Sequence, residues 1–144
     1  MTSPCPDLIP DALWDAYAET LYVFRDEDSV GVLRTGALPD QTTEDVLTRE
    51  VETSGAVVSA AWPQHGPLAG QEGDSGSLRD HLRADGYRFY AGAGMGMSPG
   101  DDAEPCFFVP GIAEADAIAL GQAFGQNTVL IIERGRPSRL VACR

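Results

Sequence analysis

The sequence contains no lysine, and all ten of its basic residues are arginines. This absence excludes chemistry that depends on a lysine amine, such as Schiff-base formation and the lysine that contacts nucleotide phosphates in kinases and ATPases. We attribute the missing lysines to the codon usage of a GC-rich genome, so they give no further information on function.

Cysteine and histidine are also scarce. The three cysteines, Cys5, Cys106 and Cys143, form no CxxC pair, and there are only two histidines. No segment therefore has the ligand spacing of a zinc site. We expect no metal site and no cofactor.

Long apolar runs are missing as well. The longest, such as 106–110 and 128–132, have the length of strands and fall far below the roughly 20 residues that cross a bilayer. The first ten residues contain no arginine and no continuous apolar core, so they do not resemble a secretory signal. We therefore expect a soluble, cytoplasmic protein without a membrane association.

Acidic residues are abundant, and the formal net charge is −12. Residues 1–52 hold twelve Asp and Glu against three Arg, whereas residues 106–144 hold three against four. A negative field of this strength repels phosphate backbones, so we expect no nucleic-acid binding. The acidic surface is typical of a soluble protein, and a basic protein partner or DNA mimicry is the less favoured alternative.

The length of 144 residues and the 43% hydrophobic content predict a single domain, residues 1–144. The periodicity predicts an α+β fold in the order α-β-β-α-β-α-β-β-α-β-β, with helices packed on a mixed or mainly antiparallel sheet of about six to seven strands. The predicted helices cover 11–19, 43–51, 77–85 and 113–124, and the predicted strands cover 21–24, 30–34, 56–62, 87–90, 105–109, 128–133 and 139–142.

Several boundaries follow from capping and glycine signals. Thr42 or Thr43 is placed to cap the second helix, and Ser77 to cap the third. Residues 64–76 and 91–103 are rich in glycine and are predicted to be loops. The glycines in the second of these segments are not followed by a helical pattern, so we interpret it as a mobile loop or lid and not as a phosphate-binding loop.

Glu104 is the candidate catalytic residue. It lies between an acidic segment and an apolar strand, where partial burial would raise the pKa of its carboxyl and suit it to acid–base chemistry. The alternative is a structural role, in which hydrogen bonds of the carboxylate hold the adjoining segment. Cys106 opens the apolar run and is interpreted as a buried thiol, with a nucleophile as the less favoured alternative.

Five further side chains are candidate ligand-binding residues. Gln126 and Asn127 follow a helix and precede a strand, so their amides could bind either turn carbonyls or a polar ligand. Trp62 and His65 flank the first glycine-rich segment and could form the wall of a cleft, although packing or solvent exposure is the simpler interpretation. Tyr22 could orient a substrate.

Several segments resemble a bacterial family of unknown function, domain-of-unknown-function family 3293. The C-terminal segments are the more specific, because Glu-Pro before an apolar strand is combined with Phe-Gly-Gln after a helix. The matching segments are Tyr17-x-x-Thr20-x-Tyr22, 55–60 with Pro63, Leu82-x-x-x-Gly86-Tyr87, 104–112, Ala117, Leu120-Gly121 and 124–127.

Two departures from the family pattern concern asparagine. Family members resemble Thr-Ala-Trp-Asn-Pro at the end of the corresponding segment, whereas this chain has Trp62 before Pro63 in place of the asparagine. The family's following helix usually carries further asparagines, and residues 70–77 of this chain contain none. If those asparagines line a site, the resemblance implies that this chain keeps Glu104 and Gln126 and has a changed or lost activity.

Two functions are compatible with these observations. The first is a non-catalytic module that binds a small molecule or a protein, favoured by the absence of metal-ligand or nucleophile spacing. The second is a small enzyme without a cofactor, a cyclase, isomerase or hydrolase, with Glu104 as acid or base. In the second case Tyr22, Gln126 or Asn127 would orient the substrate.

Overall fold

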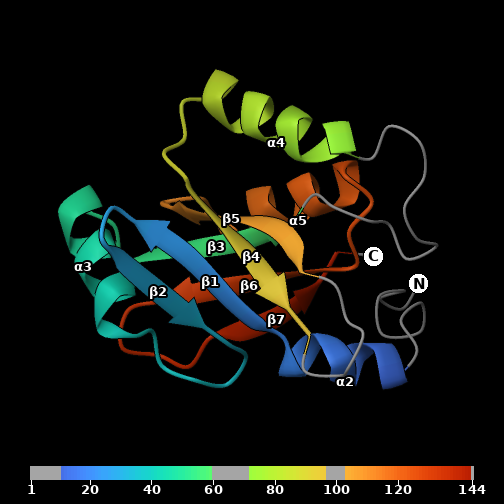
Figure 1. Ribbon diagram of the computed structural model, residues 1–144, viewed down its shortest axis with the longest axis horizontal. Helices are drawn as coiled ribbons and strands as arrows, with labels where there is room; N and C mark the ends of the chain where they lie inside the picture. Colours follow the sequence, from blue (N-terminus) through green and yellow to red (C-terminus); the bar gives the residue numbers. More distant parts are fainter. Residues whose placement is uncertain (1–10, 60–71, 97–102, 144) are drawn as a thin grey trace.

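The structure is a computed structural model, and it describes residues 11–59, 72–96 and 103–143 (Figure 1). The elements follow one another in the predicted order. They are α2 (Asp11–Glu19), β1 (Leu21–Asp26), β2 (Ser29–Leu33), α3 (Gln41–Glu50), β3 (Ser54–Ser59), α4 (Glu72–Ala84), β4 (Tyr90–Met95), β5 (Glu104–Pro110), α5 (Glu114–Ala123), β6 (Thr128–Glu133) and β7 (Arg139–Ala142).

The seven strands form one sheet in the order β2-β1-β4-β5-β3-β6-β7, and every neighbouring pair is antiparallel. The α+β prediction with about six to seven strands is therefore confirmed. Three pairs of neighbours are also consecutive in the chain: β1 with β2, β4 with β5, and β6 with β7. Strand β5 joins the two halves of the sheet, because it lies between β4 and β3.

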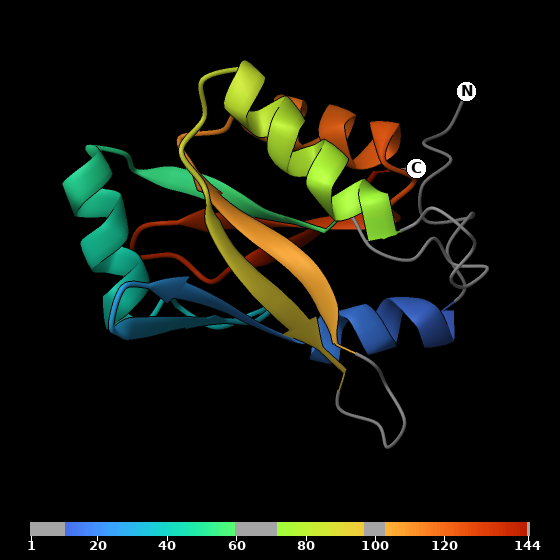
Figure 2. The same cartoon turned by 45° about the horizontal axis from the view of Figure 1, so that its top comes forward.

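Helices cover both faces of the sheet, and the alternating strand pattern separates two apolar clusters. Helices α4 and α5 lie together over one face, while α3 lies at one end of the sheet and α2 at the other (Figures 1 and 2). The cluster beneath α4 and α5 includes Leu78, Leu82, Phe107, Val109, Ala117 and Ile131. The cluster on the opposite face includes Tyr22, Phe24, Val46, Leu47, Cys106 and Phe108.

The third helix begins earlier than predicted. Helix α4 starts at Glu72, so Ser77 is not its N-cap and the predicted loop is wrong over residues 72–76. Glycine lowers helix propensity by about 1 kcal/mol relative to alanine, and this segment contains two glycines, which is why the sequence pattern pointed to a loop. Residues 64–71 of the predicted loop lie outside the described residues.

The N-cap of α3 is Asp40, so the prediction of Thr42 or Thr43 was wrong. The Asp40 carboxylate accepts hydrogen bonds from the backbone N–H of Thr43 at 3.0 Å and from the Thr43 hydroxyl at 2.6 Å. Thr43 is itself buried, and its hydroxyl therefore needs this partner. The second carboxylate oxygen of Asp40 accepts a hydrogen bond from the backbone N–H of Val32 at 2.8 Å, which ties the helix to the edge strand β2.

The largest correction concerns the glycine-rich segment after Tyr90. It was predicted to be a loop or lid over 91–103, with a strand at 87–90, but the strand is β4, Tyr90–Met95. A Cβ atom at Gly92 would collide with the backbone carbonyl oxygen of Val23 on β1. Glycine within a strand marks a close backbone approach, and here it allows β1 and β4 to pair. Residues 97–102 lie outside the described part of the chain.

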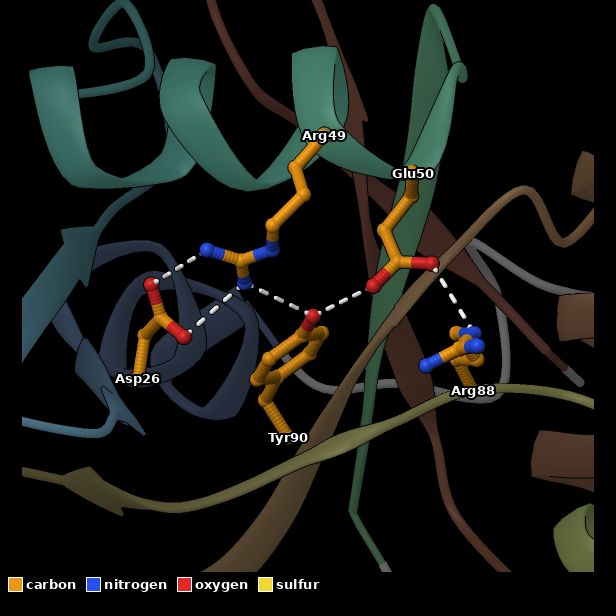
Figure 3. A network of polar contacts seen from close by, with 5 residues as sticks. All are labelled: Asp26, Arg49, Glu50, Arg88 and Tyr90. Carbon is orange, nitrogen blue, oxygen red and sulfur yellow. Dashed lines mark hydrogen bonds and ion pairs between the residues drawn. The ribbon is translucent and has the colours of Figure 1, made fainter.

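A network of polar side chains ties α3 to strands β1 and β4 (Figure 3). The guanidinium of Arg49 donates to both carboxylate oxygens of Asp26, at 2.9 and 3.2 Å, and to the hydroxyl of Tyr90 at 3.0 Å. The Tyr90 hydroxyl donates to Glu50 at 2.6 Å, and Glu50 also pairs with Arg88 at 3.2 Å. The network positions the first residue of β4 against the end of the helix.

The close approach at Gly92 generates a prediction. Gly92→Ala should lower the free energy of unfolding by about 3 kcal/mol or more, because the added methyl meets backbone atoms of β1 that cannot rotate away. Gly94→Ala is the matched control: its Cβ would lie 3.1 Å from the Tyr22 ring, which can shift, so we expect a loss of about 1 kcal/mol. Urea unfolding measures both, and equal losses would contradict the argument.

Candidate functional site

The candidate site is built by the register of three strands. Tyr22 on β1 lies directly opposite Gly94 on β4, and Gly94 lies directly opposite Glu104 on β5. Residues directly opposite one another in a sheet share a face, so the side chains of Tyr22 and Glu104 project on the same side. Cys106, two residues along β5, is on this side as well. We call Tyr22, Gly94, Glu104 and Cys106 the Glu104 site.

Gly94 places no side chain of its own between the two polar side chains. The Cα atoms of Tyr22 and Glu104 are separated by two strand spacings, roughly 9–10 Å. The Tyr22 ring lies over Gly94, since a Cβ there would be 3.1 Å from Tyr22 Cε1. Any larger residue at position 94 would therefore press on the Tyr22 ring.

Glu104 has the perturbed carboxyl that the sequence analysis anticipated. Partial burial raises the pKa of Glu104 from its ordinary value to about 7, because a desolvated carboxylate is disfavoured relative to the neutral acid. At neutral pH the carboxyl is therefore divided between its two forms. It can donate a hydrogen bond in one form and accept in the other.

The neighbouring groups of the site remain protonated. Burial, with smaller contributions from Cys106 and Glu104, raises the pKa of Tyr22, and a hydrogen bond with Thr20 opposes this shift. Burial and the Glu104 charge raise the pKa of the Cys106 thiol to about 12. Cys106 is thus a buried thiol, as interpreted from the sequence, and its low acidity disfavours the alternative role of a nucleophile.

Asn127 is joined to this site through α2. Its side-chain amide donates to the Tyr17 hydroxyl at 2.7 Å, and the charge of Tyr17 in turn contributes to the raised pKa of Tyr22. The Asn127 carbonyl oxygen accepts the backbone N–H of Cys143 at 2.7 Å, which holds the start of β6. Tyr17 thus connects two predicted site residues.

The other residues predicted to bind a ligand are not part of the Glu104 site. Gln126 is buried, and its side-chain amide donates to the Phe124 carbonyl oxygen at 3.5 Å, so this contact directs it to the C-terminal turn of α5. Trp62 and His65 lie outside the described residues. The structure thus brings Tyr22 and Glu104 together and links Asn127 to them.

Within residues 11–59, 72–96 and 103–143, no group of three or more His, Cys, Asp or Glu side chains is arranged to hold a metal ion. Among the helices so described, none combines the length and the apolar character that crossing a membrane requires.

Comparison with known families supports the resemblance seen in the sequence. Residues 71–129 match the family model described as "Protein of unknown function (DUF3293)". Over these residues the chain is similar to that family. The DUF3293 range contains Glu104, Gln126 and Asn127, whereas Tyr17 and Tyr22 precede it. No curated protein and no solved structure matches the chain.

One group of polar residues was missed by the sequence analysis. His81, Asp85, Tyr87 and Asp116 line a cavity of about 470 Å³ between α4 and α5, within the DUF3293 range. The i,i+4 spacing of His81 and Asp85 was a usable signal, because such residues share one face of a helix. Tyr87 and Asp116 come from separate elements, and only the packing of the helices brings them to the same place.

The raised pKa of Glu104 predicts a pH-dependent stability. The folded protein holds this proton more tightly than the unfolded chain, so its free energy of unfolding falls as the pH rises from about 4.5 to about 7. Glu104→Gln should therefore be more stable than the wild type at pH 8 by about 1–2 kcal/mol, allowing for solvent screening at a partly exposed group, and equally stable at pH 4.

Urea unfolding at pH 4, 6 and 8 measures this difference. Glu27→Gln, an exposed carboxylate at the β1–β2 turn, removes the same charge and controls for the general effect of lowering the net charge of an acidic protein. Parallel stability curves for Glu104→Gln and the wild type across this pH range would show that the carboxyl is not perturbed.

Proposed function

We propose that this protein binds a small polar molecule, neutral or cationic, at the Glu104 site. The observation that carries the proposal is the placement of Glu104 opposite Gly94 on the same face as Tyr22, which leaves a partly buried carboxyl and a buried phenol on either side of a residue without a side chain. A few polar groups that converge in apolar surroundings are typical of a small-molecule site.

The charge of the site favours a neutral or cationic ligand. No arginine among the described residues contributes to the pKa of Glu104, Tyr22 or Cys106. An anionic ligand would therefore meet the negative charge of Glu104 without a compensating cation. A carbonyl or hydroxyl group could instead accept a hydrogen bond from the Glu104 acid or the Tyr22 hydroxyl, and an amine could donate one to the Glu104 carboxylate.

The second candidate function is acid–base catalysis, and one observation favours it. A carboxyl whose pKa is about 7 is suited to both taking up and releasing a proton at neutral pH. In this case Glu104 would transfer the proton and Tyr22 would orient the substrate by its hydroxyl. The reaction would be one that needs no nucleophile from the protein, such as an isomerisation, a cyclisation or a hydrolysis.

A fragment screen by ligand-observed NMR tests the binding proposal. The probes are small amides, alcohols, amines and carboxylates, screened against the wild type, Glu104→Gln and Glu104→Ala. We expect amides, alcohols or amines to bind the wild type, to weaken at least tenfold in Glu104→Ala, and to stay within about threefold in Glu104→Gln, because an amide still donates and accepts hydrogen bonds. Fragments that bind all three proteins equally, or a preference for carboxylates, would overturn the proposal.

The same variants separate binding from catalysis. Glutamine keeps the shape and hydrogen bonds of Glu104 but cannot transfer a proton. If fragments that bind are also converted by the wild type, Glu104→Gln should lower the rate by about 10²–10⁴-fold while binding persists. Tyr22→Phe should weaken binding and leave any proton transfer by Glu104 in place. A conversion that Glu104→Gln leaves unchanged would exclude Glu104 as the acid or base.

A further inference from the structure

A second candidate site lies between helices α4 and α5, on the sheet face opposite the Glu104 site. We call it the α4–α5 groove, and its volume is about 470 Å³. It lies within the range of cavities that hold small organic ligands. Its lining residues are His81, Asp85, Tyr87, Ile112, Asp116, Ala119, Leu120 and Ala123.

The floor of the groove is apolar. Ile112 and Leu120 belong to the apolar cluster beneath α4 and α5, with 2% and 6% of their surfaces exposed. Ala119 and Ala123 form part of the α5 side, where their small side chains leave room above the floor. Ala123 is exposed and lines this groove.

Negative charge lies on both sides of this floor. Asp85, after the end of α4, pairs with the His81 Nε2 at 3.1 Å, and Asp116 belongs to the first turn of α5. The pKa of Tyr87 is raised by partial burial, then by the charges of Asp116 and Asp85, so the hydroxyl lies close to both carboxylates. No arginine is among the residues that line the groove.

We propose that the α4–α5 groove binds a small organic cation with an apolar body. The apolar part would lie on Ile112 and Leu120, and the ammonium or amidinium group would lie between Asp85 and Asp116, where its charge complements both carboxylates. The Tyr87 hydroxyl supplies a further polar contact. The groove is separate from the Glu104 site, so this inference goes beyond the function proposed there.

Charge complementarity and shape together define the ligand. A hydrophilic cation alone would gain little, because the His81 and Asp85 side chains are about half exposed, at 50% and 52%, and pairs with exposed carboxylates are weak. An apolar molecule alone would cover the floor but would not use the negative charge of the two carboxylates. A bare metal ion is disfavoured, since the polar side chains of the groove do not form a group of three or more metal ligands, and the described residues contain no such group.

Titrations of the full-length protein, followed by ¹H–¹⁵N NMR, test this proposal. The probes are 2-phenylethylamine and its neutral analogue 2-phenylethanol. We expect the amine to shift amide signals of α4 and α5 with a millimolar Kd, and the alcohol to bind at least fivefold more weakly. Asp85→Asn and Asp116→Asn should each weaken the amine about three- to fivefold and leave the alcohol unchanged.

Two control variants make the outcome specific. Asp80→Asn removes the same charge from α4 outside the groove lining and should not alter the amine's Kd; an equal weakening there would reveal only general attraction to an acidic protein. Equal binding of the amine and the alcohol would overturn the role of charge.

Glu104→Ala should leave the α4 and α5 shifts intact, so failure of the groove and failure of the Glu104 site are distinguished. The spectra themselves report whether each variant is folded.

Discussion

The close approach of strands β1 and β4 is the constraint on which the candidate site depends. The backbone carbonyl of Val23 occupies the place where a Cβ of Gly92 would be, so this pair of strands can form only when position 92 has no side chain. Pairing of β1 with β4 then sets the register that places Tyr22 opposite Gly94, and Gly94 opposite Glu104. The glycines that appeared to mark a flexible loop thus bring a phenol and a carboxyl from distant parts of the sequence to one face of the sheet.

Three of the described arginines pair with carboxylates outside that site. Arg49 pairs with Asp26, Arg134 with Glu44, and the Arg139 guanidinium with Glu114, so these cations neutralise carboxylates that hold helices to strands. Such exposed ion pairs each contribute little to the stability of the fold, but they help to orient helices against strands. The protein therefore combines a structural use of these arginines with two candidate sites in which no arginine is among the described groups around the carboxyls. This division explains why the excess of acid in the sequence does not itself identify a ligand.

The sequence predicted the order of elements because apolar periodicity and turn residues are local signals. The bounds of β6 and β7 were right to the residue, since both strands are rich in β-branched or leucine side chains and end at clear turn residues. The errors at β4 and at the start of α4 arose where glycine was read as a loop, although long-range packing determines the structure there. For the site, Glu104 and Tyr22 were each named as candidates from the sequence, but their placement on one face required the strand order, which local patterns do not specify.

The position of β5 has a consequence for how the protein assembles. The β1–β2 hairpin forms one half of the sheet, and β3, β6 and β7 form the other; the β4–β5 hairpin is hydrogen-bonded to both and is the only connection between them in the sheet. Loop closure over long sequence separations is entropically slow, so the β1–β2 and β6–β7 hairpins can gain their local pairs before the long-range pairings form. The boundary between β1 and β4 passes between Tyr22 and Gly94, so the Glu104 site forms only when one of these long-range pairings is in place. The local stability of the Glu104 site therefore depends on the stability of the β1–β4 pairing.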